Sequence, residues 1–228
     1  QLLIENNYKV ITCRRSEFKD LKRYEGVDFI KGDACEYETH QNLVNKAIAL
    51  YGRLDLYVNN VGVSEWKSID EVDNYFLDKL FKTNLYSVIW GCKAAEKHLI
   101  KKGSIINISS IAGKRGSKNN SIYVATKFGV NGITQSLAKE LGEKNIRVNA
   151  LCPVLIKTSG LIKALKEESA PGYGDIDMFF NDFTESQTAL NRLPSLNEVA
   201  QMVLFLASEK ASAITGQCIN VDCGVLPQ

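Results

Sequence analysis

A tyrosine, a lysine and a serine have the spacing that acid–base catalysis by a phenol requires. Tyr123 and Lys127 lie four residues apart in YVATK, and Ser110 lies thirteen residues before Tyr123 in INISSIAG. Side chains four residues apart share a helix face, so the lysine charge is expected to lower the tyrosine pKa from about 10. A serine hydroxyl at a strand end can hold the oxygen that receives the proton. The spacing therefore indicates redox chemistry on a carbonyl or an alcohol.

The Tyr-x-x-x-Lys spacing is weak evidence without its surroundings, because Tyr75 and Lys79 have it too. That second pair lies in an amphipathic stretch with no serine at a preceding strand end, and we interpret it as a surface pair. Tyr123, by contrast, opens a predicted helix, and Ser110 follows a buried strand. In open parallel sheets, ligands bind beyond the carboxyl ends of the strands. This context favours Tyr123 and Lys127 as the functional pair.

The composition restricts the class of protein. The 228 residues suit one domain, and 45% hydrophobic with 24% charged residues is typical of a soluble globular chain. A net charge of +2 gives no sign of nucleic-acid binding, and no apolar run approaches the roughly 20 residues that span a bilayer. The six cysteines form no CxxC pair and no histidine completes a zinc site, so we predict no metal and a cytoplasmic location. Both histidines, His40 and His98, are interpreted as surface residues.

Short apolar runs alternate with amphipathic stretches along the chain. The pattern predicts strands at 8–13, 27–31, 54–58, 104–108, 146–151 and 218–221, and helices at 38–51, 72–100, 122–141 and 197–207. Ser195 and Glu198 have the spacing of a capping box at the last of these helices. The alternation predicts an α/β fold: a doubly wound parallel sheet in a Rossmann-like, three-layer α/β/α arrangement.

One region, residues 158–193, breaks this alternation. A segment of that length with weak internal order is typical of a functional lid or binding loop, so we predict a substrate lid within the single domain 1–228. Its aromatic and acidic side chains include Tyr173, Phe179, Phe180, Phe183, Asp175, Asp177, Asp182 and Glu185. The acids do not favour an anionic substrate such as an acyl-carrier thioester.

Several motifs, in order, resemble the short-chain dehydrogenases/reductases, specifically their classical branch. NNVG at residues 59–62 resembles the family's NNAG, with valine for alanine. RVNALCPVLIKT resembles its RVN…PGxxxT, with Val154 in place of glycine. AITGQCINVDCG resembles its ITGQxxxVDGG, with Cys223 in place of one glycine. The resemblance covers the chain from Gln1 to the C-terminus.

The same resemblance implies a catalytic tetrad of Asn84, Ser110, Tyr123 and Lys127. Tyr123 would transfer a proton to or from the substrate oxygen that Ser110 holds, while a nicotinamide cofactor exchanges hydride. Lys127 would bind the nicotinamide ribose, and Asn84 would bend its helix and seat a water in a proton relay. The alternative is that Asn84 and Ser110 are only helix-kink and cap residues. The family also implies a homodimer or homotetramer, formed through the helices of Asn84 and Tyr123 and the last strand.

The residues after the first predicted strand favour NADP(H). In dinucleotide folds an acid after the second strand binds the ribose 2′-OH of NAD, whereas arginine accommodates the 2′-phosphate of NADP. Here Arg14 and Arg15 follow the strand without an acid, although both could be ordinary surface arginines. Asp33 in KGDAC resembles the family's adenine-contacting aspartate. The remaining cofactor contacts that the resemblance implies are Asn59, Tyr123, Lys127, Ile156 and Thr158.

The strand and TGxxxGxG turn that open the family are not found in this chain, and the turn is what brings a helix N-terminus to the pyrophosphate. Residues 1–7, QLLIENN, resemble the end of the helix that follows that turn. We therefore expect a fold without its first strand and Gly-rich turn, in which the backbone groups of two strands stay unpaired. Either the natural protein carries this segment or the chain is a shortened product.

The predicted function is that of an NADP-dependent oxidoreductase acting on a carbonyl or secondary alcohol of a small molecule, with no nucleic-acid or membrane partner. The alternative is a catalytically idle relative that serves as a binding or scaffold module, and an assembly role through the long helices is compatible with either. Two substrate classes stay open, a 3-oxoacyl thioester and a keto-sugar of surface-glycan synthesis.

Overall fold

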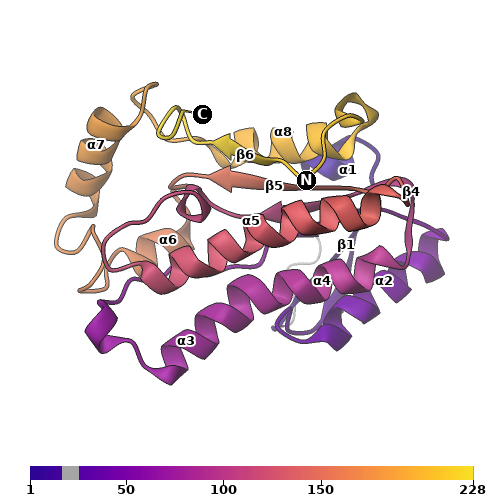
Figure 1. Cartoon of the computed structure of the whole chain (residues 1–228), viewed down its shortest axis with the longest axis horizontal. Helices are drawn as coiled ribbons and strands as arrows, with labels where there is room; N and C mark the ends of the chain where they lie inside the picture. Colours follow the sequence, from indigo (N-terminus) through magenta and orange to yellow (C-terminus); the bar gives the residue numbers. More distant parts are fainter. Residues whose placement is uncertain (17–25, 228) are drawn as a thin grey trace.

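The structure is a computed structural model that describes residues 1–16 and 26–227 (Figure 1). The strands are β1 (Val10–Arg14), β2 (Val27–Lys31), β3 (Leu54–Asn59), β4 (Leu99–Ile108), β5 (Arg147–Pro153) and β6 (Cys218–Val221). The α-helices are α1 (Leu2–Glu5), α2 (Tyr37–Tyr51), α3 (Asn74–Phe81), α4 (Ser87–Glu96), α5 (Ser121–Gly142), α6 (Ser159–Ala164), α7 (Ile176–Gln187) and α8 (Leu196–Ala207). Shorter helical turns are Ile69–Glu71, Lys82–Tyr86, Ile111–Gly113 and Glu209–Ala211.

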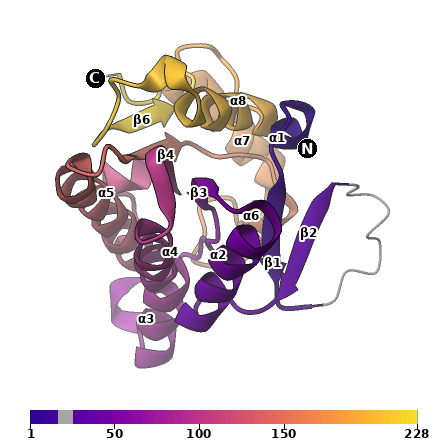
Figure 2. The same cartoon turned by 90° about the vertical axis from the view of Figure 1, so that its right-hand side faces the viewer.

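The strands are parallel and carry helices on both faces, which confirms the predicted fold class. β3, β4, β5 and β6 form one sheet in that order, and β1 pairs with β2. Helices α2, α4 and α5 cover one face, and α1 and α8 cover the other (Figures 1 and 2). Strands buried on both faces need nearly continuous apolar runs, and every residue of β5 is buried.

Two apolar clusters hold these layers together. On one face, Val44 of α2, Val88 of α4 and Val130 of α5 pack against Ile105 and Val148 of the central strands. On the other face, residues of α8 pack against the opposite sides of β4 and β5; this cluster contains Ile106, Leu151, Val203 and Leu206. Because successive strand residues point to opposite faces, neighbours such as Ile105 and Ile106 anchor different layers. The central strands are thereby fixed from both sides.

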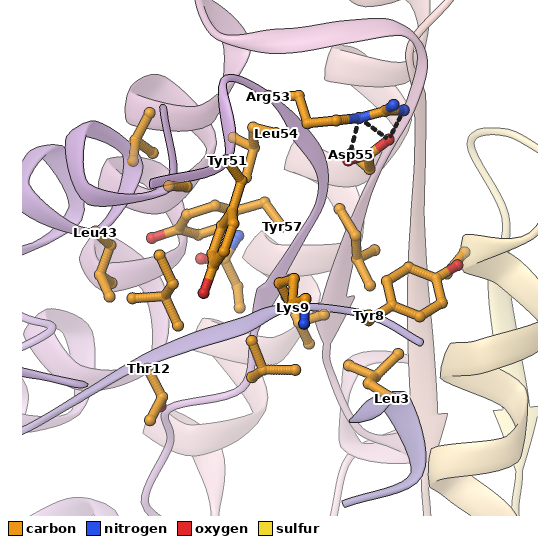
Figure 3. Close-up of a pocket in the computed structure, with 18 of the residues that line it drawn as sticks. Leu3, Tyr8, Lys9, Thr12, Leu43, Tyr51, Arg53, Leu54, Asp55 and Tyr57 are labelled. Atoms are coloured by element: carbon orange, nitrogen blue, oxygen red, sulfur yellow. Dashed lines mark hydrogen bonds and ion pairs between the residues drawn. The ribbon is translucent and has the colours of Figure 1, made fainter. Parts of the chain in front are cut away.

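Among the described residues, β1 and β3 do not pair with each other. β1 pairs with β2 alone and β3 with β4 alone, so the strands form a two-stranded and a four-stranded part. A cavity of about 840 Å³ lies between β1 and β3 (Figure 3). The predicted site residues are divided between the two parts.

Two regions differ from the sequence predictions. The helix predicted for 72–100 is α3, a π-helical turn and α4, and it ends at Glu96 because Leu99 already pairs with Leu54 of β3. The lid was predicted to have weak internal order, but it contains α6 and α7. Both helices begin at side-chain caps: Thr158 accepts from the Leu161 amide and Asp175 from the Met178 amide. Such caps stabilise short helices whose apolar pattern is weak.

The predicted capping box at α8 is confirmed, and one histidine was misassigned. Ser195 Oγ accepts from the Glu198 amide at 3.2 Å, while Glu198 accepts from the Ser195 amide at 2.8 Å. His40 was predicted to lie on the surface, but it is buried, because α2 turns it inward toward Tyr57. Its Nδ1 lies 2.7 Å from the Tyr57 hydroxyl and its Nε2 2.7 Å from the Ala34 carbonyl oxygen. These contacts satisfy both ring nitrogens inside the protein.

No helix in the part of the chain that the structure describes is both long and apolar enough to cross a membrane.

Candidate active site

The predicted site residues gather at one edge of the fold, beyond the carboxyl ends of the strands. Arg14 ends β1, Asp33 follows β2, Asn59 ends β3 and Ser110 follows β4. Thr158 follows β5 and caps α6. In parallel α/β sheets this edge is where ligands bind, because the loops and helix N-termini there are free of the sheet's own pairing. The sequence therefore folds its candidate residues into one region.

Helix α5 presents Tyr123 and Lys127 toward the end of β4. The buried residues of this helix recur at helical spacing and include Lys127, Val130, Thr134 and Ala138. Lys127 is almost fully buried, and its Nζ donates to the Ile108 carbonyl oxygen at 3.0 Å. The same Nζ lies 5.7 Å from the centre of the Tyr123 ring. The lysine is thus held between the strand end and the tyrosine, as the four-residue spacing predicts.

The electrostatics of this pair differ from the prediction. Burial raises the pKa of Tyr123, although a hydrogen bond with Ser110 opposes the rise. The expectation that Lys127 lowers the tyrosine pKa is therefore wrong for this structure, in which desolvation of the phenolate dominates. Burial also lowers the pKa of Lys127 to about 8. Both shifts favour the neutral forms, a phenol and an amine, compared with the same side chains in water.

Ser110 lies where the chain leaves β4. Its Oγ accepts from the Ala112 amide at 3.1 Å and donates to the Pro153 carbonyl oxygen at 3.4 Å. The serine is thus a cap, as the alternative interpretation holds, but it also bonds the Tyr123 side chain. Its hydroxyl is tied both to the end of β5 and to the phenol.

Asn84 is fully buried within the π-helical turn Lys82–Tyr86 that joins α3 to α4. Its Oδ1 accepts from the Val63 amide at 2.8 Å, and its Nδ2 donates to the Val63 carbonyl oxygen at 2.9 Å. A π-turn disturbs the regular backbone ladder of a helix and is frequent at functional sites. The predicted irregularity at Asn84 is thus present, and the side chain ties it to the loop after β3.

Gly62 explains why this loop approaches the tetrad so closely. A Cβ placed on Gly62 would lie 3.3 Å from Asn84 Oδ1 and 3.6 Å from Lys127 Nζ. The glycine of NNVG therefore leaves a side-chain-free backbone between two members of the tetrad. Sequence reasoning identified the motif but not this role, and it gave no signal for Val63, whose contribution is made by backbone atoms alone.

Replacing Asn84 by alanine should lower the free energy of unfolding by about 1–3 kcal/mol. Two hydrogen bonds are lost, and the amide and carbonyl of Val63 are left without these partners. Urea unfolding followed by circular dichroism measures the change. Asn181→Ala is the matched control, since Asn181 is exposed on α7. Equal stability of the Asn84 variant and the control would contradict the tying role of Asn84.

The second Tyr-x-x-x-Lys pair is on the surface, as predicted. Tyr75 is 76% exposed, and Lys79 Nζ forms an ion pair with Glu65 Oε1 at 2.6 Å. Identical spacing thus occurs once beside the strand end and once in solvent. The serine at the end of β4 is what distinguishes the two.

The residues predicted for the adenosine half of a dinucleotide lie together beyond β1 and β2. Arg14 and Arg15 are exposed, and Arg14 Nε donates to Ser16 Oγ at 2.8 Å. Arg15 Nη1 lies 3.9 Å from Asp33 Oδ2, and Asp33 Oδ1 accepts from the Cys35 amide at 3.0 Å. Two guanidinium groups and one carboxylate therefore face the same end of the two-stranded part, where a phosphate and an adenine amine would find partners.

Asn59 has a different environment from the other predicted cofactor residues. Its side chain is buried, and Nδ2 donates to Asn107 Oδ1 at 2.9 Å, while Asn107 Nδ2 donates to Thr134 Oγ1 at 2.9 Å. A Cβ on Gly91 would lie only 1.9 Å from Asn59 Oδ1, so α4 can approach this amide only through glycine. The side chain links β3, β4 and α5 and leaves the Asn59 backbone to line the cavity.

The lid is anchored on the loop that follows β3. Trp66, which sequence reasoning did not single out, packs in an apolar cluster with Leu165, Ala170 and Phe180 of the lid. A second cluster joins Ile111, next to Ser110, to Phe183 of α7. Thr158 and Ile156 lie at the lid's start, where the Thr158 amide donates to the Ile156 carbonyl oxygen at 2.6 Å. The lid is thus packed against both the loop and the serine segment.

The chain matches known protein sequences over nearly all its length. A profile of the family described as enoyl-(acyl carrier protein) reductase matches residues 2–226. A diacetyl reductase, (S)-acetoin forming, of Staphylococcus epidermidis is 36% identical over 99% of this chain and 88% of its own. A 3-oxoacyl-acyl-carrier-protein reductase of Chlamydia muridarum is 35% identical over 92% of this chain and 82% of its own.

Solved structures are similar over the whole chain. The ligand-free aldohexose dehydrogenase of Thermoplasma acidophilum has a TM-score of 0.86 and 28% identity, covering 100% of this chain and 90% of its own. ElxO with NADP bound has a TM-score of 0.85 and 30% identity, covering 100% of this chain and 92% of its own. The arrangement of strands and helices is therefore that of oxidoreductases with known structures.

Proposed function

The chain belongs to the classical short-chain dehydrogenase/reductase family, and we propose that it is an NADP(H)-dependent oxidoreductase in which Tyr123 is the general acid and base. The observation that carries the proposal is the convergence of Tyr123, Lys127, Ser110 and Asn84 at the carboxyl edge of the sheet. Gly62 lies between two of them, and the fully buried Asn84 is joined to its loop by two hydrogen bonds. A catalytically idle protein that serves only as a scaffold would not require this arrangement.

In the reductive direction, the Tyr123 hydroxyl gives its proton to the substrate carbonyl oxygen while the Ser110 hydroxyl holds that oxygen. When bound, NADPH supplies the hydride, so a carbonyl, one hydride and one proton give an alcohol. The raised pKa of Tyr123 keeps the phenol protonated at neutral pH, as a proton donor must be. In the oxidative direction Tyr123 must first lose its proton, and a positive Lys127 favours that step.

The lowered pKa of Lys127 can be tested through the pH dependence of stability. Lys127 has a folded-state pKa of about 8, below the roughly 10.4 of a free lysine. Between these values the unfolded state binds more protons, so the contribution of Lys127 to the unfolding free energy rises with pH, by up to about 3 kcal/mol. The free energy of unfolding of the parent chain, less that of the Lys127→Met variant, should therefore grow from pH 8 to 10. Chemical unfolding at each pH measures it, and a flat difference would contradict a depressed pKa.

NADP(H) is favoured over NAD(H) by the donors beyond β1. Arg14 and Arg15 offer guanidinium groups and Asp33 a carboxylate acceptor, which fits a dinucleotide that carries a 2′-phosphate. At the other end of the dinucleotide, Lys127 beside Gly62 is proposed to bind the nicotinamide ribose. We propose that Asn59, Ile156 and Thr158 contact the cofactor as well. ElxO, whose structure contains NADP, supports the preference by similarity.

The substrate is proposed to be a small, uncharged carbonyl compound or secondary alcohol. The lid carries aromatic and acidic side chains together, among them Tyr173, Phe183, Asp175 and Asp182. Two carboxylates disfavour a polyanionic acyl carrier, whereas aromatic rings and acids together suit a hydroxylated ring. This favours a keto-sugar or small ketone over a 3-oxoacyl thioester, although relatives named for both kinds of substrate are similar to this chain.

Oxidation of NADPH, followed at 340 nm, tests the proposal with a diketone such as diacetyl, a keto-sugar and a 3-oxoacyl thioester. Turnover of at least one carbonyl substrate with NADPH is expected, with the thioester slowest. Absence of turnover across all three classes would instead favour the catalytically idle scaffold.

We further propose a cytoplasmic homodimer or homotetramer. Tyr86 of the π-turn and Phe128 of α5 are 43% and 47% exposed, which suits a contact between subunits through these helices. All six cysteines are free, as expected in a reducing compartment. Sedimentation velocity distinguishes the assembly states.

A further inference from the structure

His40 is a buried histidine that the proposed proton transfer does not use. It is 4% exposed and lies in the first turn of α2, soon after the residues that follow β2. Its ring lies between the carbonyl group of Ala34 and the hydroxyl group of Tyr57, which belongs to β3. Ala34 is next to Asp33, the proposed adenine contact, in residues 33–36, which we call the adenosine turn. The ring therefore joins the adenosine turn to β3.

The two contacts select one form of the imidazole ring. The Ala34 carbonyl oxygen can only accept, so Nε2, at 2.7 Å, carries the proton and donates the hydrogen bond. Burial lowers the pKa of His40 and favours the neutral ring, whose other nitrogen is an acceptor. The Tyr57 hydroxyl, at 2.7 Å, therefore donates to Nδ1. One tautomer thus satisfies both ring nitrogens, the phenol and the carbonyl group together.

Tyr57 gives this chain of hydrogen bonds a rigid end. Its backbone pairs with Ile105 of β4, and the residue is buried. A Cβ placed on Gly91 of α4 would lie 2.9 Å from Cε1 of the Tyr57 ring, so the helix packs directly against the ring. Close packing of this kind leaves the phenol little room to move. The position of β3 is therefore passed to the ring of His40.

The adenosine turn depends on outside contacts because its own hydrogen bonds are local. Asp33 Oδ1 accepts from the Cys35 amide at 3.0 Å, and the Asp33 carbonyl oxygen accepts from the Glu36 amide at 3.0 Å. These bonds fix the shape of the turn, but they do not fix its place on the fold. The place must come from contacts with neighbouring elements.

Two contacts of different strength tie the adenosine turn to its neighbours. Cys35 Sγ lies 3.8 Å from Thr83 Oγ1, and a thiol is a weak donor. The bond from His40 is short and reaches the carbonyl group of Ala34, which is itself buried. Without the ring, that carbonyl group would be enclosed and lack this partner, which is unfavourable. We therefore expect the turn to move when the ring is removed.

We propose that His40 is a positioning residue, which with Tyr57 holds the adenosine turn so that the Asp33 carboxylate meets the adenine of the cofactor. The ring acts through the Ala34 carbonyl group, one residue from Asp33, and does not itself touch the cofactor. The inference rests on the proposed function only in the adenine contact of Asp33. Binding of the adenosine half should thus depend on His40, and proton transfer at Tyr123 should not.

Amide hydrogen exchange without cofactor tests the positioning. In His40→Leu, exchange at the Cys35 and Glu36 amides should be about 10-fold faster than in the parent, the effect of losing one buried hydrogen bond. His40→Gln keeps an N–H donor for the carbonyl group and should restore most of the protection. His98→Leu is the matched control, because His98 is exposed, and it should change the exchange of neither amide.

Nitrogen NMR of the imidazole ring gives a second readout that does not depend on the folding of His40→Leu. At about pH 7.5 the parent should show Nε2 protonated and Nδ1 unprotonated. Tyr57→Phe removes only the hydroxyl that donates to Nδ1, so the Nδ1 resonance should shift and exchange at Cys35 should become faster. A mixture of tautomers in the parent would contradict the assigned donors and overturn the proposal.

Cofactor binding tests the link to the adenine. Calorimetric titration with NADPH should give a Kd about 10-fold higher for His40→Leu than for the parent, with kcat at saturating NADPH within about twofold. Unchanged exchange at Cys35 and Glu36 would overturn the proposal whether or not the chain binds NADPH. Faster exchange with an unchanged Kd would overturn the link to the adenine and leave the proposed function standing. Failure of the parent to bind NADPH would overturn the proposed cofactor and the adenine link with it, while the exchange rates would still decide whether His40 holds the turn.

Discussion

Replacement of Tyr123 by phenylalanine should reduce kcat for carbonyl reduction with NADPH by about 10²–10⁴, the range that a positioned general acid contributes. The phenol is the group that can protonate the substrate oxygen, and its hydroxyl is bonded to Ser110. Phenylalanine keeps the ring beside Lys127 and removes only the hydroxyl. Stability should therefore change little, and the loss should appear in kcat and not in the KM for NADPH.

The chain provides its own control for this experiment. Tyr75→Phe makes the same chemical change in the other Tyr-x-x-x-Lys sequence, where Tyr75 is 76% exposed and Lys79 pairs with Glu65. Its kcat should equal that of the parent. If the Tyr123 and Tyr75 variants retain equal activity, Tyr123 is not the acid, and a binding or scaffold role becomes the better account of the fold.

Replacing both Arg14 and Arg15 by alanine should raise the KM for NADPH by about 100-fold and leave the KM for NADH nearly unchanged. Hydrogen bonds to charged groups contribute about 1.5–3 kcal/mol each, and 1.36 kcal/mol corresponds to a factor of ten. Both arginines are exposed at the carboxyl end of β1, so their removal should not disturb the core. NADH is the matched ligand because it differs from NADPH by the 2′-phosphate.

The measurement is initial velocity against each cofactor at fixed substrate, with Arg53→Ala as the protein control. Arg53 lies before β3, at the opposite edge of the sheet, and pairs with Asp55. A similar rise in KM for both cofactors would mean that the two arginines act on folding or on the shared part of the dinucleotide. In that case the proposed NADP preference would be wrong.

Most of the fold could be predicted because its signals are local. Residues 27–31 and 218–221 were assigned as strands with the bounds that the structure has, since each is a short apolar run between polar segments. The failures have tertiary causes. Leu99 and Ile100 continue the apolar pattern of the preceding helix, and only pairing with β3 shows that they begin a strand. The helices of the lid depend on the caps Thr158 and Asp175 more than on periodicity.

Tyr123, Lys127 and Ser110 could be singled out by their side chains and spacing, whereas Asn84 was implied only by the resemblance to the family. The contacts that position them could not. Val63 holds Asn84 through backbone atoms, which every residue has, and Gly62 acts through the absence of a side chain. The pKa of Tyr123 was predicted with the wrong sign, since spacing reveals the nearby lysine but not the desolvation around the ring. Electrostatics of a buried site depend on packing that a sequence pattern does not contain.

The contacts around Asn84, Lys127 and Ser110 also set the order in which the proposed site can form. Asn84 is bonded to Val63, 21 positions away, Lys127 to Ile108, 19 away, and Ser110 to Pro153, 43 away. Each contact closes a loop that local helix formation does not bring together, and such closures limit the rate at which chains of this topology fold. Helical structure can therefore form well before these residues are brought together. Recovery of activity then reports the last long-range closures, and circular dichroism the first local ones.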